Sequence, residues 1–431
     1  METHAQQAAA SLRSESGMIP IVHYRDAADL ATHKAVCFAE AERAVGPILE
    51  AVRTRGDAAL LEYARQFDGF DGTSVVIPAD ECHAALEELG TEFLCAVETA
   101  SENIRAYAQM QLPRERSTSS PDGRRLGWIV RPLDSMGVYI PAGRYPLPST
   151  LLMTVIPAQI AGVKKICVAC PRPSAEILGL AAYLNVPHVF RMGGAQAIAA
   201  FAYGTGTVPK VDRIVGPGNI YVAAAKKLIA GETGIDFIAG PTEIVIITAE
   251  ADPAPVAADM LAQAEHDTEA SAILLTTSRP LADAVAAEIE RQLDSLPTAP
   301  VAREAIVRNS AIVLVDSLQQ AVEFSNRLAP EHLVLHDAGL LPDVRHAGSI
   351  FLGPNSPEAA GDYCSGPNHV LPTSGAARLR GGLSTADFVK VISVQELTPA
   401  ALAKLAPAVT SLARAEGLEA HARSVEVRIR G

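Results

Sequence analysis

The sequence lacks two features: an apolar run long enough to cross a bilayer, and a cluster of basic residues. Its longest apolar segments, such as AQIAGVKKICVAC (158–170), are interrupted by glycine or charge well short of the roughly 18 residues that a membrane helix needs. The 431 residues carry a formal net charge of −13. Nucleic acid and anionic membrane are therefore poor candidates for the main partner, and a small-molecule enzyme is favoured.

Cysteines are few and scattered, which argues against a disulfide framework. The closest pair, Cys167 and Cys170, lies in KKICVACP, which is typical of a strand. Because side chains alternate along a strand, a separation of three points the two thiols to opposite faces. We expect core cysteines here, not a redox or metal pair. The N-terminal METHAQQAAASLRSES lacks the apolar core of a secretory signal, so we expect residues 1–17 to be a disordered extension and the protein to be cytoplasmic.

The ordinary dinucleotide fingerprint is also missing, because no GxGxxG follows a predicted strand. Glycines do stand between a strand and a helix in FRMGGAQAIAA (190–200) and RIVGPGNIYVAA (213–224), and VYIPAGRYPLPST (138–150) is similar. Their backbone N–H groups could meet a phosphate, or the glycines could simply form tight turns. Both interpretations remain open from these segments alone.

Strands and helices alternate through most of the chain. Residues 27–112 are mostly helical in pattern, and from about 126 short Val- and Ile-rich strands such as MGVYIP alternate with helices. A second alternating block begins at EIVIITAE (243–250). This pattern predicts an α/β protein with mostly parallel sheets covered by helices. Residues 353–383 form a long Gly- and Pro-rich loop, and loops of this length are usually functional or disordered.

MLAQAEHDTEAS (260–271) is the first candidate site. Asp252 and Pro253 can cap and start a helix that runs toward His266, so Gln263 and His266 would share one face at i and i+3. That spacing lets both side chains converge on one ion, but it also suits the polar end of a helix. Glu265 and Asp267 would point away from this face. Gln is a weak zinc ligand, so a metal site would need better partners elsewhere.

Glu331 and His332, in LAPEHLVL, occupy a predicted corner between a helix and a strand. A carboxylate and an imidazole supply two bases that titrate in different ranges. Adjacent residues of an extended chain face opposite ways, however, so a shared site requires a bent backbone here. A surface loop is the alternative.

Two further acid–histidine pairs remain ambiguous. Asp362 and His369 fall in GDYCSGPNH, where a flanked Asp can coordinate a metal or hold a turn. Glu416 and His421, in EGLEAHARS, differ by five positions, and nothing local indicates that they act together.

Taken together, these segments resemble the histidinol dehydrogenase family over about residues 20–430. The resemblance rests on segments in matching order: VYIPAGRYPLPST, GGAQAIAA, GPGN, GPTE, LAQAEHD, APEHL, GDYCSGPNHVLPT and EGLEAHARS. It implies two incomplete Rossmann-like α/β units with small terminal extensions, in an intertwined homodimer with shared active sites. The implied parts are 18–29 as an N-terminal extension, 30–137 with 243–383 as a first α/β domain holding the metal and catalytic residues, 138–242 as a second, NAD-binding domain, and 384–431 as a C-terminal extension contacting the partner subunit.

The resemblance also implies the chemistry: L-histidinol is oxidised through L-histidinal to L-histidine, in the last steps of histidine biosynthesis, by two NAD-dependent steps. His332 would be the base for the alcohol and Glu331 would activate water. One zinc ion per subunit would be held by Gln263, His266, Asp362 and His421. The implied substrate contacts are Thr242, Gln263, His266, His332, Asp362, Glu416 and His421, with Glu416 and His421 from the neighbouring subunit. The dinucleotide would lie near Tyr139, Gln196 and Asn219.

The sequence departs from the family pattern at three positions. Thr242 stands where Ser is common, Ala142 replaces a Gly, and Cys364 stands where a small residue is usual. Two other activities fit the same residues: a related NAD-dependent dehydrogenase of another alcohol, such as a sulfonated diol, and a zinc hydrolase in which Glu331 activates water. A catalytically silent NAD-binding protein is the third alternative.

Overall fold

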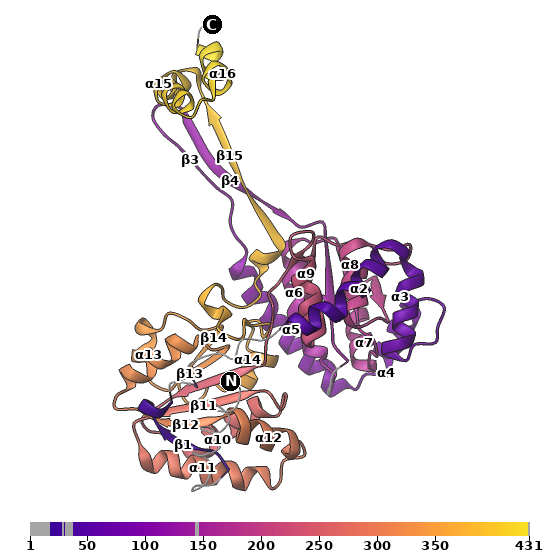
Figure 1. Ribbon diagram of the computed structural model, residues 1–431, viewed down its shortest axis with the longest axis vertical. Coiled ribbons are helices and arrows are strands. Elements are labelled where there is room, and N and C mark those ends of the chain that lie inside the picture. Colours follow the sequence, from indigo (N-terminus) through magenta and orange to yellow (C-terminus); the bar gives the residue numbers. More distant parts are fainter. Residues whose placement is uncertain (1–17, 28–29, 31–37, 143–145, 430–431) are drawn as a thin grey trace.

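Two six-stranded sheets form the body of the molecule, and a narrow arm projects from it (Figure 1). The computed structural model describes residues 18–27, 30, 38–142 and 146–429. The extension predicted over residues 1–17 lies outside this part of the chain. None of the helices in the described part combines the length and the apolarity of a membrane span. The predicted α/β class with largely parallel sheets is confirmed.

The first sheet, here sheet I, is parallel except at its edge, where β2 runs antiparallel to β7. Its strands in spatial order are β2 (Val76–Ile77), β7 (His188–Phe190), β6 (Lys165–Ala169), β5 (Ser135–Tyr139), β8 (Arg213–Val215) and β9 (Gly234–Ile235). One face packs on α4 (Ala79–Glu88), α5 (Thr91–Gln111), α6 (Pro148–Ala161) and α7 (Ala175–Tyr183). The other face packs on α2 (Ala39–Arg55), α3 (Asp57–Tyr63), α8 (Gly194–Tyr203) and α9 (Ile220–Ile229).

The second sheet, here sheet II, is parallel throughout. Its strands in spatial order are β1 (Ile21–His23), β12 (Ala311–Leu314), β11 (Ser271–Thr276), β10 (Glu243–Ile247), β13 (His332–Leu335) and β14 (Ser349–Leu352). One face packs on α10 (Pro253–Ala264), α11 (Arg279–Leu293) and α12 (Ala299–Asn309), and the other on α13 (Leu318–Leu328). The short helix α14 (Glu358–Tyr363) lies beside α10.

The central strands explain why these sheets form where the sequence predicts them. β5 and β10 are buried at every position, as expected for a parallel sheet with both faces covered. The two thiols of KKICVACP confirm the strand alternation, because Cys167 packs in the cluster on one face and Cys170 in the cluster on the other. Both thiols are free.

The helical segment before β5 belongs to a different sheet from the one we predicted. We grouped residues 30–137 with 243–383, but α2 to α5 pack on both faces of sheet I, which contains the strands of 138–242. The reason is that α2 and α5 bury their apolar faces against α8, α9 and α6, helices of sheet I itself. Residues 21–23, predicted as part of an extension, pair as the edge strand of sheet II.

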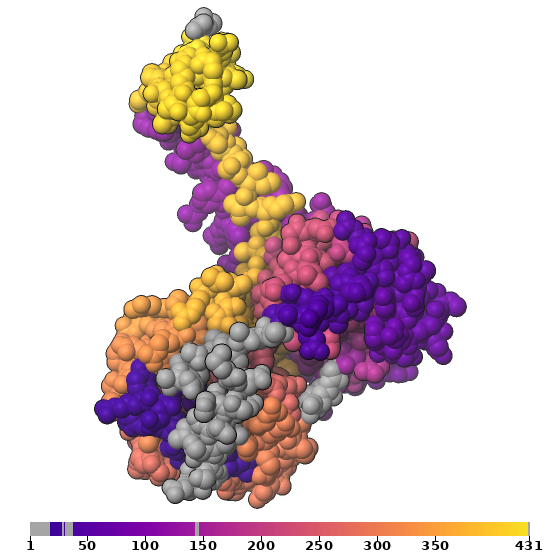
Figure 2. All heavy atoms as spheres, in the orientation of Figure 1, coloured from indigo at the N-terminus to yellow at the C-terminus, as the bar shows by residue number. Residues whose placement is uncertain are grey.

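The arm consists of three antiparallel strands and two terminal helices (Figures 1 and 2). These elements are β3 (Arg116–Ser119), β4 (Arg124–Pro132), β15 (Val389–Leu397), α15 (Pro399–Ala415) and α16 (Glu419–Ile429). β15 and β4 pair over nine residues, from Val389 opposite Pro132 to Leu397 opposite Arg124. Figure 2 shows the two helices as a separate cluster at the tip, away from both sheets.

Candidate active site

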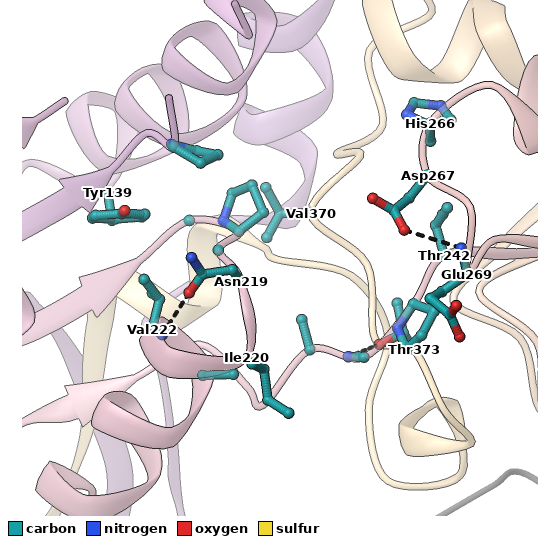
Figure 3. A pocket seen from close by; sticks show the side chains of 18 of the residues that line it. Tyr139, Asn219, Ile220, Val222, Thr242, His266, Asp267, Glu269, Val370 and Thr373 are labelled. Atoms are coloured by element: carbon teal, nitrogen blue, oxygen red, sulfur yellow. Dashed lines mark hydrogen bonds between the residues drawn. The ribbon is translucent and has the colours of Figure 1, made fainter. Parts of the chain in front are cut away.

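A cavity of about 1410 Å³ lies between the carboxyl ends of the strands of sheet I and the amino ends of the strands of sheet II. Tyr139, the last residue of β5, and Asn219, the N-cap of α9, line one wall. Thr242, just before β10, and His332, the first residue of β13, line the other. Figure 3 shows Tyr139 and Asn219 on one side and Thr242 and His266 across from them.

The chain connection brings these two edges together. β9 ends at Ile235, at the carboxyl edge of sheet I, and β10 begins at Glu243, at the amino edge of sheet II. Residues 236–242, here the crossing segment, are the whole connection between β9 and β10. Because this segment is short, the carboxyl edge of one sheet must face the amino edge of the other.

The sheet I wall consists of strand ends and helix beginnings. The Tyr139 hydroxyl accepts a hydrogen bond from the backbone N–H of Gly194 over 3.1 Å, and burial raises the pKa of Tyr139 to about 12. The Gln196 amide is fully buried and donates to Asp68 Oδ2 over 3.0 Å. Asn219 caps α9 by accepting from the N–H groups of residues 221 and 222, each over 3.1 Å.

The glycine motif of this wall serves close packing. Gly216 has φ of +112°, and a Cβ there would lie 2.1 Å from the carbonyl oxygen of Tyr139. Only glycine fits this crossing between the ends of β5 and β8. The first glycine of GPGN therefore lets the backbone at the end of β8 pack directly against the backbone at the end of β5, beside the cavity.

On the sheet II wall, the structure brings Glu331 and His332 together. Ala329 ends α13 with φ of +53°, and the chain bends again at Glu331 before β13 begins at His332. The Glu331 Oε2 atom lies 3.8 Å from His332 Nδ1. Glu331 Oε2 accepts from the Thr242 hydroxyl and, over 3.0 Å, from the N–H of Glu243.

His332 is buried among carboxyl groups. Burial disfavours its charged form, but Glu331, Asp362 and Glu358 outweigh burial and raise the pKa of His332 to about 10. Burial in turn raises the pKa of Glu331 above its ordinary value. The His332 Nδ1 atom lies 3.3 Å from the carbonyl oxygen of Glu243. Nε2 is buried and has no hydrogen-bond partner among the residues that the structure describes, with Asp362 Oδ1 3.7 Å away. The contact of Nδ1 with this carbonyl is a hydrogen bond when Nδ1 carries a proton, and in that tautomer of the neutral ring Nε2 is the free base.

His266 and Asp362 are the candidate metal ligands that converge most directly. His266 Nε2 lies 3.8 Å from Asp362 Oδ2. Burial would raise the pKa of Asp362, but His332, His369 and His266 hold it below its ordinary value, so Asp362 is an anion. Gln263 is fully buried and bonds Thr242 Oγ1 through its side-chain amide over 2.6 Å.

The helix carrying these residues is shorter than predicted. Asp252 and Pro253 start α10 as expected, but α10 ends at Ala264, so His266 lies in the bend beyond it. Glu265 does point away, toward the Thr298 hydroxyl at 2.5 Å. The expectation that Asp267 also points away is wrong, because Asp267 lines the cavity and accepts from the N–H of Glu269 over 3.0 Å (Figure 3). The chain must turn here to enter β11, and Asp267 holds that turn.

The remaining pair lies far from this cavity. Glu416 caps the end of α15 and His421 belongs to α16, so both are at the exposed tip of the arm (Figure 1). Within the described part of one chain, no three His, Cys, Asp or Glu side chains converge to hold a metal ion.

Several residues of the site gave no local signal in the sequence. They are Asp68, Glu243 and Glu358. Asp68 ends a short π-helical turn and reaches Gln196, 128 positions away. Glu358 begins α14, and its Oε2 atom is 4.0 Å from His332 Nδ1. His369 bonds the carbonyl of Asp362 over 2.8 Å, which orients the loop that carries Asp362. His369 differs from these three, because the sequence alone already indicates it as a candidate, together with Asp362 in GDYCSGPNH.

Comparison with known proteins identifies the relatives of this chain. The sequence profile described as histidinol dehydrogenase matches residues 32–429. A histidinol dehydrogenase of Geobacter metallireducens is 47% identical over 404 residues, covering 91% of this chain and 92% of that protein. One of Halalkalibacterium halodurans is 47% identical over 397 residues, covering 90% and 94%. The crystal structure of histidinol dehydrogenase from Elizabethkingia anophelis superposes with a TM-score of 0.93 at 34% identity, covering 96% of this chain and 99% of that one. The chain therefore belongs to the histidinol dehydrogenase family of NAD-dependent oxidoreductases, which act on CH–OH donors.

Proposed function

We propose that the chain oxidises L-histidinol to L-histidine through L-histidinal, in two successive NAD-dependent steps at a zinc-containing site. The observation that carries this proposal is a cavity with the Glu331–His332 base pair on one wall and the glycine-rich strand ends on the other. The proposal gives each site residue the role that the family resemblance implies for it. Free buried cysteines fit a reducing compartment, so we place the enzyme in the cytoplasm.

The sheet I wall is suited to a dinucleotide. The order β7-β6-β5-β8-β9 is that of a Rossmann-like unit, in which ligands bind at the carboxyl ends of the strands where the order reverses. That point lies between β5 and β8, where Tyr139 and the GPGN turn meet. Gln196 and Asn219 lie at the beginnings of α8 and α9, whose N–H groups favour a pyrophosphate. We assign Tyr139, Gln196 and Asn219 to NAD.

The sheet II wall is suited to zinc, but only with help from a second chain. His266, Asp362 and Gln263 offer the mixed nitrogen and oxygen donors that a borderline ion accepts. A fourth ligand is required, and we propose His421 of a second copy, with Glu416 of that copy contacting the substrate. When bound, the zinc ion would orient the substrate's imidazole and amine and would lower the pKa of His332.

The arm supports an intertwined homodimer. Large apolar side chains on its strands and helices are exposed in the single chain, among them Trp128 (40%), Val391 (56%), Leu412 (67%) and Val427 (65%). Exposed apolar surface of this extent marks a protein interface. An arm that is covered by a second copy can carry His421 into the cavity of that copy.

The residues then divide the proton transfers. In the first oxidation His332 Nε2 takes the hydroxyl proton of histidinol while hydride passes to NAD⁺, and Nδ1 stays fixed on the carbonyl of Glu243. In the second, Glu331 takes a proton from the water that adds to the aldehyde, and the resulting hydrate passes hydride to a second NAD⁺. Burial raises the pKa of Glu331 and makes it a stronger base for this step. Thr242 positions Glu331 and contacts the substrate.

The experiment is histidinol-dependent NADH formation, measured with and without a zinc chelator and with the yield of NADH per histidinol recorded. The proposal predicts two NADH per histidinol and loss of turnover on chelation. Turnover of a sulfonated diol in preference to histidinol would favour the related dehydrogenase. Hydrolysis without NADH would favour the hydrolase.

A further inference from the structure

A buried ion pair in the sheet I wall has no role in the proton transfers described above. Lys226 Nζ lies 2.7 Å from Asp236 Oδ1, and the two side chains are 3% and 2% exposed. Lys226 is on α9, and Asp236 is the first residue of the crossing segment. Both residues line the cavity.

The pair holds one glycine from two sides. Asp236 Oδ2 accepts from the N–H of Gly216 over 2.8 Å, and Lys226 Nζ donates to the carbonyl oxygen of Gly216 over 2.6 Å. Asp236 Oδ1 also accepts from the N–H of Phe237 over 2.7 Å. The first glycine of GPGN is therefore tied directly to the segment that leads to Thr242.

The crossing segment is also tied to the loop that carries Asp362. Arg380 donates to the carbonyl oxygen of Asp236 over 2.6 Å, and its guanidinium lies 5.1 Å from the ring centroid of Phe237. The same side chain bonds Asp387 over 2.8 Å, near the base of the arm. The connections from Gly216 thus reach both sides of the cavity.

A buried ion pair is a poor way to gain stability. Removing two charges from water opposes folding, and apolar residues of similar volume often stabilise a core as well or better. Charged hydrogen bonds do, however, fix direction and distance in a way that apolar contacts do not. The features that Lys226 and Asp236 fix are the peptide groups of Gly216, at the turn that we assign to NAD.

We propose that Lys226 and Asp236 are positioning residues for the dinucleotide: they set the shape of the GPGN turn and fix it to the crossing segment, so that NAD⁺ is held in reach of the substrate. This inference rests on the proposed function, since it takes the GPGN turn as the NAD site. It adds two residues that act through the peptide groups of Gly216.

The test is calorimetric titration of NAD⁺ into the zinc-loaded protein and three variants. Asp236→Asn keeps the size of the side chain but replaces one of its two acceptor oxygens by an NH2 group, so that a donor faces either Gly216 N–H or the pair of Lys226 Nζ and Phe237 N–H. The double variant Lys226→Met with Asp236→Leu removes both charges and leaves neither one buried alone. The control is Lys227→Met, which removes the neighbouring and more exposed ion pair with Glu42, at 2.6 Å.

We expect Asp236→Asn and the double variant to bind NAD⁺ at least tenfold more weakly, with histidinol affinity within twofold of the original chain and the control unchanged. If the pair is purely structural, the double variant should have the melting temperature and the NAD⁺ affinity of the original chain. That result overturns the proposal. If the double variant does not fold, Asp236→Asn decides, because unchanged NAD⁺ affinity contradicts the proposal. NAD⁺ binding is read directly, so absence of histidinol turnover in the original chain would overturn the proposed function and leave this test valid.

Discussion

Sheet I and sheet II border the same cavity with opposite edges. Sheet I contributes the ends of β5 and β8 and the beginnings of α8 and α9. Sheet II contributes the beginnings of β10 and β13, and the chain just beyond the end of α10. In a parallel sheet each helix runs back to the amino edge, so α10 necessarily brings Gln263 and His266 to the edge that carries Thr242 and Glu331.

The difference between the edges is electrostatic. Helix beginnings carry partial positive charge and free N–H groups, which suit the anionic pyrophosphate of a dinucleotide. Helix ends carry partial negative charge, and sheet II adds Glu331, Asp362 and Asp267 around the cavity. This wall therefore suits a metal ion and a positively charged amino alcohol. One cavity can hold an anion on one wall and cations on the other because its two sheets face it in opposite directions.

His332→Asn should have the largest effect, and it should act on one wall only. Loss of a positioned general base should lower kcat for histidinol oxidation by about 10²–10⁴-fold. Asn has no free base to replace Nε2, so the alcohol proton has no acceptor. The measurement is NADH formation, with zinc content and NAD⁺ affinity as controls that should not change. Turnover equal to that of the original chain would contradict the role of His332.

Complementation tests whether the sheet II wall needs a second chain. His421→Ala chains and Glu331→Ala/His332→Ala chains should each be nearly inactive alone. Mixed after unfolding and refolding, half of randomly paired dimers combine the two and contain one intact site of two, so activity should return to roughly a quarter of the original. If mixing restores nothing, the metal site is not shared between chains.

Asn219→Asp tests the sheet I wall in isolation. Aspartate is as good an N-cap as asparagine, so the melting temperature should hold, whereas the added negative charge should repel the pyrophosphate. We expect KM for NAD⁺ to rise on the order of tenfold, with histidinol affinity unchanged. Asn219→Ala is the matched variant, and it should instead lose about 1 kcal/mol of helix stability with its cap. Equal effects of Asn219→Asp on NAD⁺ and on histidinol would argue against separate walls.

The smallest effect concerns pH and the acidic wall. Burial, followed by the charge of Glu331, raises the pKa of Glu243 to about 8 from its ordinary 4.5. Between these values the folded protein keeps a proton that the unfolded chain loses, so each rise in pH lowers the free energy of unfolding. For chelator-treated protein, the melting temperature should fall by a few degrees between about pH 5 and 8. Glu243→Gln should flatten this slope, and parallel curves for the two proteins would contradict the raised pKa.

The sequence predicts elements well where apolar runs are long and local. EIVIITAE, SAILLTT and HLVL become β10, β11 and β13 because both faces of sheet II are covered. The C-terminal part of the arm falls in the extension 384–431 that the resemblance implies, but β3 and β4 were not predicted, since RRLGWIVRP alternates poorly and exposes Trp128 in the single chain. A strand that is largely exposed in the single chain carries no clear pattern of burial in its sequence.

The site was predictable only in part, for a similar reason. Glu331 and His332 are adjacent in the chain, and their corner was recognisable from Pro330. Asp68 with Gln196, and Lys226 with Asp236, meet through the fold, and no local spacing marks them. The family resemblance, not the spacing, connected His266 with Asp362, and the structure places them 3.8 Å apart.

The most direct test of the two-wall account is binding of each ligand with and without metal. NAD⁺ and histidinol are titrated separately into zinc-loaded and chelator-treated protein in a calorimeter. The account predicts NAD⁺ affinity unchanged within about twofold on metal removal, and histidinol affinity lowered by about a hundredfold or more. Loss of both affinities together, or of NAD⁺ affinity alone, would contradict it.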